Sequence, residues 1–219
     1  MPRGPFFKKL LLVLSFSLTV ASAVFLTILV HFFPVLPADV EISRKIQTEG
    51  GAIMLPAMKF VSIFGDPLIG GTAVILLFLL FFLFSYTREM RFILFMLPAE
   101  IISFIFKLLM HRPRPTSSLI KVFETVSGPG FPSGHVVHYV VFFGLLMAIV
   151  CSMEKAPFLT KTLVFFISSA LIVAISVSRV YLGAHWATDA AEGYLLGFIM
   201  LSCILSLYFR DAIRTSLNE

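Results

Sequence analysis

Charged side chains are scarce in this sequence. Asp, Glu, Lys and Arg make up 13% of the 219 residues, whereas a soluble domain carries about 25%. Hydrophobic residues account for 58% of the chain, and the mean hydropathy is +0.99. This composition excludes an ordinary soluble domain and indicates an integral membrane protein.

Cysteines and blocks of basic residues are also scarce. The two cysteines, Cys151 and Cys203, lie in apolar runs, so we expect buried free thiols and no disulfide. The net charge of +5 is small, and no run of Lys and Arg forms a basic tail. We therefore expect membrane lipids as partners, with no nucleic acid and no obligate protein partner.

Six apolar runs are long enough to cross a bilayer, which takes about 20 residues in a helix. The first run begins like a signal peptide, but it continues past Ala23 to Phe33, so we expect an uncleaved span. The sequence thus predicts one all-α domain over residues 1–219, a six-transmembrane-helix bundle. The predicted spans are residues 10–33, 68–86, 92–110, 134–152, 158–178 and 186–209.

Two features interrupt this pattern. The third predicted span contains Pro98, which should kink it, and Glu100, whose carboxylate should face the bundle interior. Residues 34–67 form the longest connection, in which apolar residues such as Val40 and Ile42 are mixed with charged ones. This mixture predicts short surface helices, although a plain solvated connector fits it equally well.

Lys and Arg are distributed almost evenly between the two sides of this bundle. If the cations around residues 107–114 have a function, they do not count toward topology, and the positive-inside rule then places both termini in the cytoplasm. In a six-span chain, the third and fifth spans end on the side where the fourth and sixth begin. That side is extracytoplasmic in this orientation.

Three polar clusters occupy these four helix ends. Clustered cations near a bilayer must reach water or an anion, because one charge in hydrocarbon costs about 2.5–3.5 kcal/mol. Arg binds phosphate oxygens through two parallel hydrogen bonds, and Lys adds a point charge. The clusters therefore predict a phosphate-binding site. They are KLLMHRPRP with Lys107, Arg112 and Arg114, PSGH from Pro132 to His135, and SRVYLGAHWATD with Ser178, Arg179, His185 and Asp189.

The PSGH cluster opens the fourth predicted span. Ser133 is a favourable N-cap, Gly134 allows close approach of the backbone, and the free amides of a helix N-terminus attract anions. His135 lies in the first turn, where it can give a proton to a leaving oxygen. His138, one turn later, is interpreted as an ordinary buried residue. We expect no metal, because no cysteine or further ligand accompanies these two histidines.

His185 and Asp189 are four residues apart, so they share one face of a helix. Asp189 can accept the proton of one imidazole nitrogen, which orients the ring and makes the other nitrogen a nucleophile. Attack of that nitrogen on phosphorus would form a phosphohistidine.

Together these clusters resemble the three motifs of the type 2 phosphatidic acid phosphatase superfamily, the lipid phosphate phosphatases. Lys107 and Arg114-Pro115, with six residues between Lys and Arg, match the first motif, and Pro132 to His135 match the second. Ser178-Arg179, five residues, His185, three residues and Asp189 match the third. The motif-bearing core is therefore residues 107–189.

The resemblance implies metal-independent hydrolysis of lipid phosphates without a cofactor. It makes His185 the nucleophile, Asp189 its orienting partner and His135 the general acid. The small six-span bacterial members that this chain resembles act on undecaprenyl diphosphate or phosphatidylglycerophosphate. A multi-pass protein of the plasma or inner membrane, with its site on the extracytoplasmic side, is expected. The residues that would hold the phosphate are Lys107, Arg114, Ser133, Gly134 and Arg179.

Other functions remain open at this point. A phosphohistidine captured by an alcohol instead of water would make the chain a lipid phosphotransferase. A non-enzymatic anion transporter and a catalytically inactive lipid-binding relative are further alternatives. The substrate also stays open among polyprenyl diphosphate, phosphatidylglycerophosphate, phosphatidic acid and lipid A phosphate.

Overall fold

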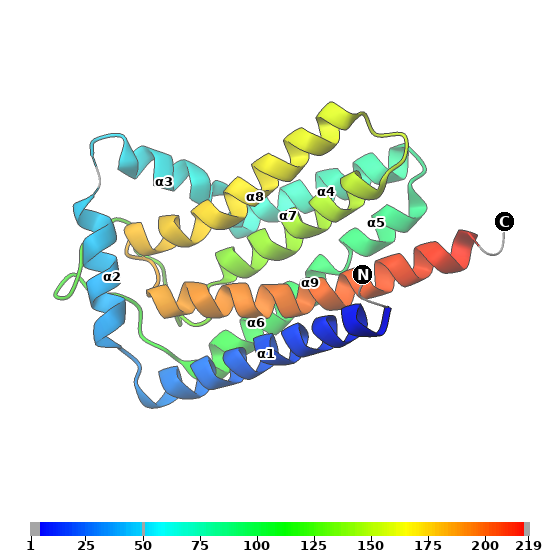
Figure 1. The fold of residues 1–219 in the computed structure, drawn as a ribbon. Coiled ribbons are helices and arrows are strands. Elements are labelled where there is room, and N and C mark those ends of the chain that lie inside the picture. The colour runs from blue at the N-terminus through cyan, green and yellow to red at the C-terminus, as the bar shows by residue number, and fades with distance from the viewer. Residues whose placement is uncertain (1–4, 50, 217–219) are drawn as a thin grey trace.

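The computed structural model describes residues 5–49 and 51–216, which fold into helices that run mostly alongside one another (Figure 1). No strand occurs in this described part of the chain. The elements are α1 (Pro5–Phe32), α2 (Pro37–Thr48), α3 (Met54–Ser62), the 3₁₀ turn η1 (Ile63–Gly65), α4 (Pro67–Leu83), α5 (Thr87–Ile93), α6 (Met96–Met110), α7 (Gly134–Ser152), α8 (Phe158–Tyr181) and α9 (Ala187–Ser216).

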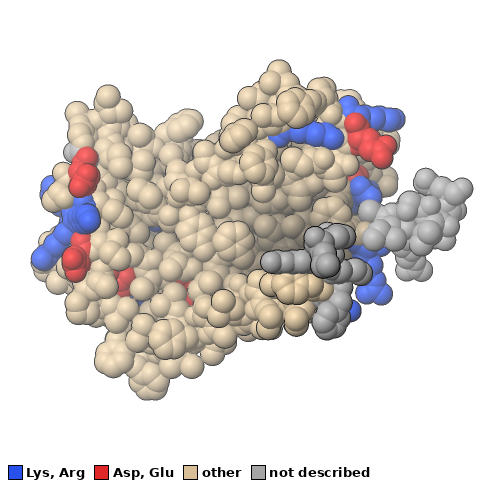
Figure 2. Space-filling view, in the orientation of Figure 1, with Lys and Arg blue, Asp and Glu red and all other residues tan. Residues whose placement is uncertain are grey.

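The helices confirm the predicted all-α membrane bundle. Five helical segments are long and apolar enough to cross a bilayer, and Thr87–Met110, which joins α5 to α6, is one of them. A sixth span arises if Met54–Gly65 and Pro67–Leu83, bent by 55°, are counted together. Acidic and basic residues gather near the two ends of the face in Figure 2, and few lie in the broad band between. That band is what a hydrocarbon core requires.

The central helix of the bundle is α7, which packs against α6, α8, α9 and η1. Its buried residues lie on all sides of the helix, as expected for an apolar helix surrounded by others. Gly193 and Gly197 of α9 allow this helix to lie close to α7: a Cβ on Gly193 would stand 2.8 Å from Cβ of Val136. The first turn of α7 is thereby fixed against α9.

The chain bends sharply between α3 and α4, ahead of α5. Residues 34–67, which we expected to be a connection, contain α2 and α3, and α3 and η1 meet the length and apolarity of a span only when they are counted together with α4. Asp66 separates the two helices: its backbone is extended, as is usual before proline, and its Oδ1 accepts hydrogen bonds from N–H of Leu68 (3.0 Å) and Ile69. Pro67 then occupies the first position of α4, where its missing N–H costs nothing.

The predicted surface helix is α2, which lies across one end of the bundle (Figure 1). Its inner face is polar rather than apolar, because Asp39, Ser43 and Gln47 are buried whereas Ile42 is exposed. Nε2 of Gln47, for example, donates to the carbonyl of Tyr181 at 2.9 Å. The helix therefore covers polar groups at this end.

The cysteine prediction was wrong in one respect. Cys151 and Cys203 are free thiols, but both are exposed rather than buried. In a membrane protein an apolar run also covers the outer surface, so hydropathy alone does not place a residue in the core.

Candidate active site

The four helix ends that carry the polar clusters lie together, at the end of the molecule that α2 covers (Figure 1). The segment 111–133 joins α6 to α7 there, and residues 182–186 join α8 to α9. A cavity of about 470 Å³ opens at this place. Its lining includes five of the eight predicted site residues: Lys107, Gly134, His135, Arg179 and His185.

The N-terminus of α7 forms one wall of the cavity. Ser133 is the N-cap by position, and its N–H donates to the carbonyl of Asp189 at 3.0 Å. Its hydroxyl does not cap the helix, contrary to expectation: Oγ is buried and has no partner among the described residues. A buried hydroxyl without a partner beside the first amides of a helix is an arrangement that suits an anion.

His185 lies between Asp189 and Arg114, and its side chain is 1% exposed. Nδ1 of His185 is 3.4 Å from Oδ2 of Asp189, slightly longer than an ordinary hydrogen bond. Nε2, on the other side of the ring, is 3.2 Å from Nη1 of Arg114. Burial, followed by the charges of Arg179, Arg114 and Lys107, holds the pKa of the His185 imidazole well below its ordinary value. His185 is therefore neutral near pH 7.

Arg114 is held largely by backbone carbonyls. Nε donates to Gly128 at 2.9 Å, Nη1 to Ala184 at 2.7 Å and Nη2 to Pro129 at 3.1 Å. Burial, and then the nearby Arg179, lower the pKa of its guanidinium from the ordinary value. Arg114 thus fixes the segment 111–133 against His185, and it has few N–H groups left for a phosphate.

Arg179 is fully buried and already binds an anionic group. Nη2 and Nη1 donate to the two carboxylate oxygens of Glu124 at 2.9 and 3.2 Å, and Nη1 also donates to Oγ of Ser62. Nε has no partner among the described residues. Lys107, in contrast, makes no hydrogen bond or ion pair within residues 5–49 and 51–216. The two cations therefore retain donors for a phosphate, and Glu124 occupies part of its place.

Arg112 connects the site to the rest of the fold, a role that the sequence did not indicate. Its guanidinium binds Asp39 of α2 through Nη2 at 2.7 Å and Oδ1 of Asp189 through Nη1. Asp39 also accepts the N–H of Thr188 at 2.9 Å. All three charged side chains are at most 1% exposed. In the sequence, the only indication of a function for Arg112 was its position within the basic cluster, and no pattern indicated a role for Asp39 in the site.

His138 and Glu100 form a second pair that sequence reasoning missed. His138 is buried, as expected, but it also lines the cavity together with Glu100. Its Nδ1 lies 2.7 Å from Oε1 of Glu100. His138 lies on α7 and Glu100 on α6.

Comparison with known proteins places the chain in a family. The family model described as the PAP2 superfamily matches residues 88–213, more than half of the sequence. The chain belongs to the PAP2 superfamily. Phosphatidylglycerophosphatase B of Bacillus subtilis (strain 168) is 33% identical over 72 residues, which cover 32% of this PAP2 chain and 34% of that relative. The match thus spans about a third of the relative's length.

Two solved structures share the fold of this PAP2 protein. The first transmembrane PAP2-type phosphatidylglycerolphosphate phosphatase from Bacillus subtilis superposes with a TM-score of 0.80, over 89% of this chain and 96% of that one. LpxE of Aquifex aeolicus superposes with a TM-score of 0.61, over 78% and 96%. Each is 19% identical to this chain, so these two likenesses establish the fold alone.

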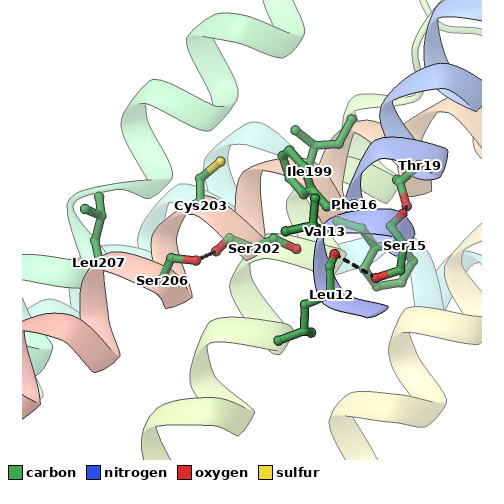
Figure 3. A pocket seen from close by; sticks show the side chains of 11 residues that line it. Leu12, Val13, Ser15, Phe16, Thr19, Ile199, Ser202, Cys203, Ser206 and Leu207 are labelled. Carbon is green, nitrogen blue, oxygen red and sulfur yellow. Dashed lines mark hydrogen bonds between the residues drawn. The ribbon is translucent and has the colours of Figure 1, made fainter. Parts of the chain in front are cut away.

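A second cavity of the PAP2 chain, of about 640 Å³, lies between α1 and α9 (Figure 3). Three of its four hydroxyl groups donate to carbonyls within their own helices: Ser15 donates to Leu12, Thr19 to Ser15 and Ser206 to Ser202. None of the predicted site residues lines it. Within the described residues, no group of three or more His, Cys, Asp or Glu side chains could hold a metal.

Proposed function

We propose that this chain is a membrane lipid phosphatase that cleaves the phosphate or diphosphate head of a lipid through a phosphohistidine at His185. One observation carries the proposal: a single cavity is lined by His185, His135 and two cations at the N-terminus of a buried helix. This is the set of groups that transfer of a phosphoryl group requires, namely a nucleophile, a proton donor and charge stabilisation.

The same cavity offers a route for a lipid. Its lining also includes Ile75 of α4 and Leu97 of α6, whose side chains are 59% and 60% exposed. A lipid can thus place its head at His185 while its tail stays in the bilayer.

The first step forms the covalent intermediate. Asp189 orients His185 through Nδ1, which leaves the lone pair of Nε2 for phosphorus. The Nε2–P bond forms as the P–O bond to the lipid breaks, and His135 gives its proton to the departing oxygen. Arg114 must release Nε2 for this attack, and the incoming phosphate offers its guanidinium an alternative acceptor.

The second step restores the enzyme. A water molecule loses a proton to His135 and attacks phosphorus, so that the new O–P bond forms while the N–P bond breaks. Inorganic phosphate leaves and His185 is neutral again. Lys107, Arg179, the Ser133 hydroxyl and the amides at Gly134 would stabilise the equatorial oxygens in both steps. Arg179 would exchange Glu124 for the phosphate.

The substrate lies among the lipid phosphates that the sequence left open, and the names of the relatives favour phosphatidylglycerophosphate. With both termini in the cytoplasm, the site would face the extracytoplasmic side. The test is phosphate release by the purified full-length protein in detergent from phosphatidylglycerophosphate, phosphatidic acid and a polyprenyl diphosphate. We expect release from at least one lipid, unchanged by EDTA, and a loss of about 10²–10⁴-fold in His135→Ala. Absence of release from every lipid would reject the proposal.

A further inference from the structure

The cavity that contains His185 and His135 is also lined by a second pair of polar side chains, Glu100 and His138. Because α7 begins at the site and runs inward, His138 lies about 5 Å deeper than His135. Because α6 ends at the site, Glu100 lies two turns, about 10 Å, deeper than Lys107. The pair therefore flanks the part of a lipid that follows its terminal phosphate.

Both members of the pair retain unused hydrogen-bonding capacity. Glu100 uses Oε1 for Nδ1 of His138, and its Oε2 has no partner within the described residues. Nε2 of His138 is buried without a partner as well. The side chain of Glu100 is 44% exposed, although it lies in a membrane-spanning segment. A carboxylate at this depth is costly unless water or a ligand solvates it, so this part of the cavity must hold a polar group.

The charges around the pair narrow the chemistry of that group. A second phosphate bonded directly to the first, as in a diphosphate, would be repelled by Glu100 and by Asp66, which also lines the cavity. An ammonium group would be repelled by Lys107 and Arg179, which line it too. A hydroxyl is neutral and can donate to a carboxylate oxygen without either penalty.

We propose that Glu100 and His138 form a binding subsite for a hydroxyl group of the substrate's head, next to the phosphate that is removed. Resting on the proposed function, this assigns the substrate class: a phosphate monoester of a polyol, such as a glycerol or sugar head. It disfavours polyprenyl diphosphate, whose second phosphate would meet the carboxylates. It also disfavours phosphatidic acid, which has no free hydroxyl to offer.

The experiment compares two substrates that differ in one group. Dioctanoyl phosphatidylglycerophosphate and its analogue without the head-group hydroxyl are each given to the full-length protein in detergent, and kcat/KM is measured. We expect the wild-type protein to prefer the hydroxylated lipid by about tenfold or more, the value of one good hydrogen bond. In Glu100→Leu the preference should fall to near one, because Leu fits the membrane but accepts no hydrogen bond.

Two further variants complete the design. His138→Phe keeps the stacking on Phe142 but removes the hydrogen-bond partner of Glu100, so it should also lower the preference for the hydroxylated lipid. This variant replaces Glu100→Leu in the test if Glu100→Leu does not fold. Glu154→Gln removes a carboxylate outside the cavity and should keep the wild-type preference. An equal rate for the two lipids in the wild type, or a preference that survives both variants, would overturn the subsite and leave the phosphatase proposal standing. No phosphate release from any lipid would overturn both.

Discussion

At the scale of residues, the His185–Asp189 pair is connected to a buried ion network that reaches beyond the three motifs. Arg112 binds Asp189 on one side and Asp39 on the other, with all three side chains excluded from solvent. A buried carboxylate that loses its partner is strongly unfavourable, so Arg112 both neutralises Asp189 and fixes its direction toward His185. Through Asp39, the helix α2 becomes part of the support of the site.

We therefore expect Arg112→Lys to lower kcat by about 10²-fold with little change in KM, because a point charge cannot bind both carboxylates at once. Steady-state kinetics on the best lipid substrate measure this. Arg44→Lys, on the exposed face of α2, is the matched control and should turn over like the wild type. Full kcat in Arg112→Lys would show that Asp189 needs no such support.

His185 also predicts a pH dependence of stability. The folded protein holds its imidazole neutral, whereas the unfolded chain binds a proton near the ordinary pKa of about 6.5. Since the unfolded state then binds more protons, the stability due to His185 is complete above about pH 6.5 and is lost as pH falls below it. Thermal unfolding in detergent from about pH 8 to about pH 5 should show a steeper loss of Tm in the wild type than in His185→Gln. Parallel curves would contradict the buried neutral imidazole.

At the scale of elements, the break between α3 and α4 brings the chain against His135, the proposed general acid. Gly65 packs so closely on His135 that a Cβ at this position would overlap the imidazole ring. The sequence predicted the span of α4 and short surface helices in the connection before it, but not that α3 would pack against α8. Asp66 and Pro67 mark the position of the break, whereas the packing of α3 on α8 and of η1 on α7 joins elements far apart in the sequence.

The break leads to a test with a matched pair of glycines. Gly65→Ala should displace His135 and lower turnover by about 10²-fold, because a shift of the proton donor of about 1 Å has an effect of this size. Gly51→Ala, where a Cβ would meet nothing within 4 Å, should keep wild-type turnover. Similar activity in both variants would mean that the position of His135 does not depend on this contact.

At the scale of the whole molecule, the sequence predicted the all-α bundle and the meeting of four helix ends. Membrane thickness sets span length, and the parity of the spans sets which ends meet. The ion-pair partners of the site residues could not be predicted from the sequence. Arg179 pairs with Glu124 and Arg112 pairs with Asp39, and both carboxylates come from segments whose paths depend on tertiary packing. The motifs predict which side chains gather, but not which of their donors remain free.

The orientation in the membrane makes a further prediction. In a background of Cys151→Ser and Cys203→Ser, a cysteine at Ser118 lies in the exposed segment between α6 and α7, on the side of the site. A cysteine at Glu154 lies at the opposite end, between α7 and α8. With an impermeant maleimide, we expect Ser118→Cys to react in intact cells and Glu154→Cys only after permeabilisation. The reverse pattern would place the site on the cytoplasmic side.

The measurement that tests the central claim most directly is the capture of the phosphoryl group on the enzyme. The full-length protein is mixed with phosphatidylglycerophosphate carrying a radioactive terminal phosphate, quenched within one turnover, and digested under conditions that preserve phosphohistidine. The account predicts label on the peptide that contains His185. A His185→Asn variant whose Tm equals that of the wild type should show neither label nor turnover. Turnover without label on His185, or wild-type turnover in His185→Asn, would contradict it.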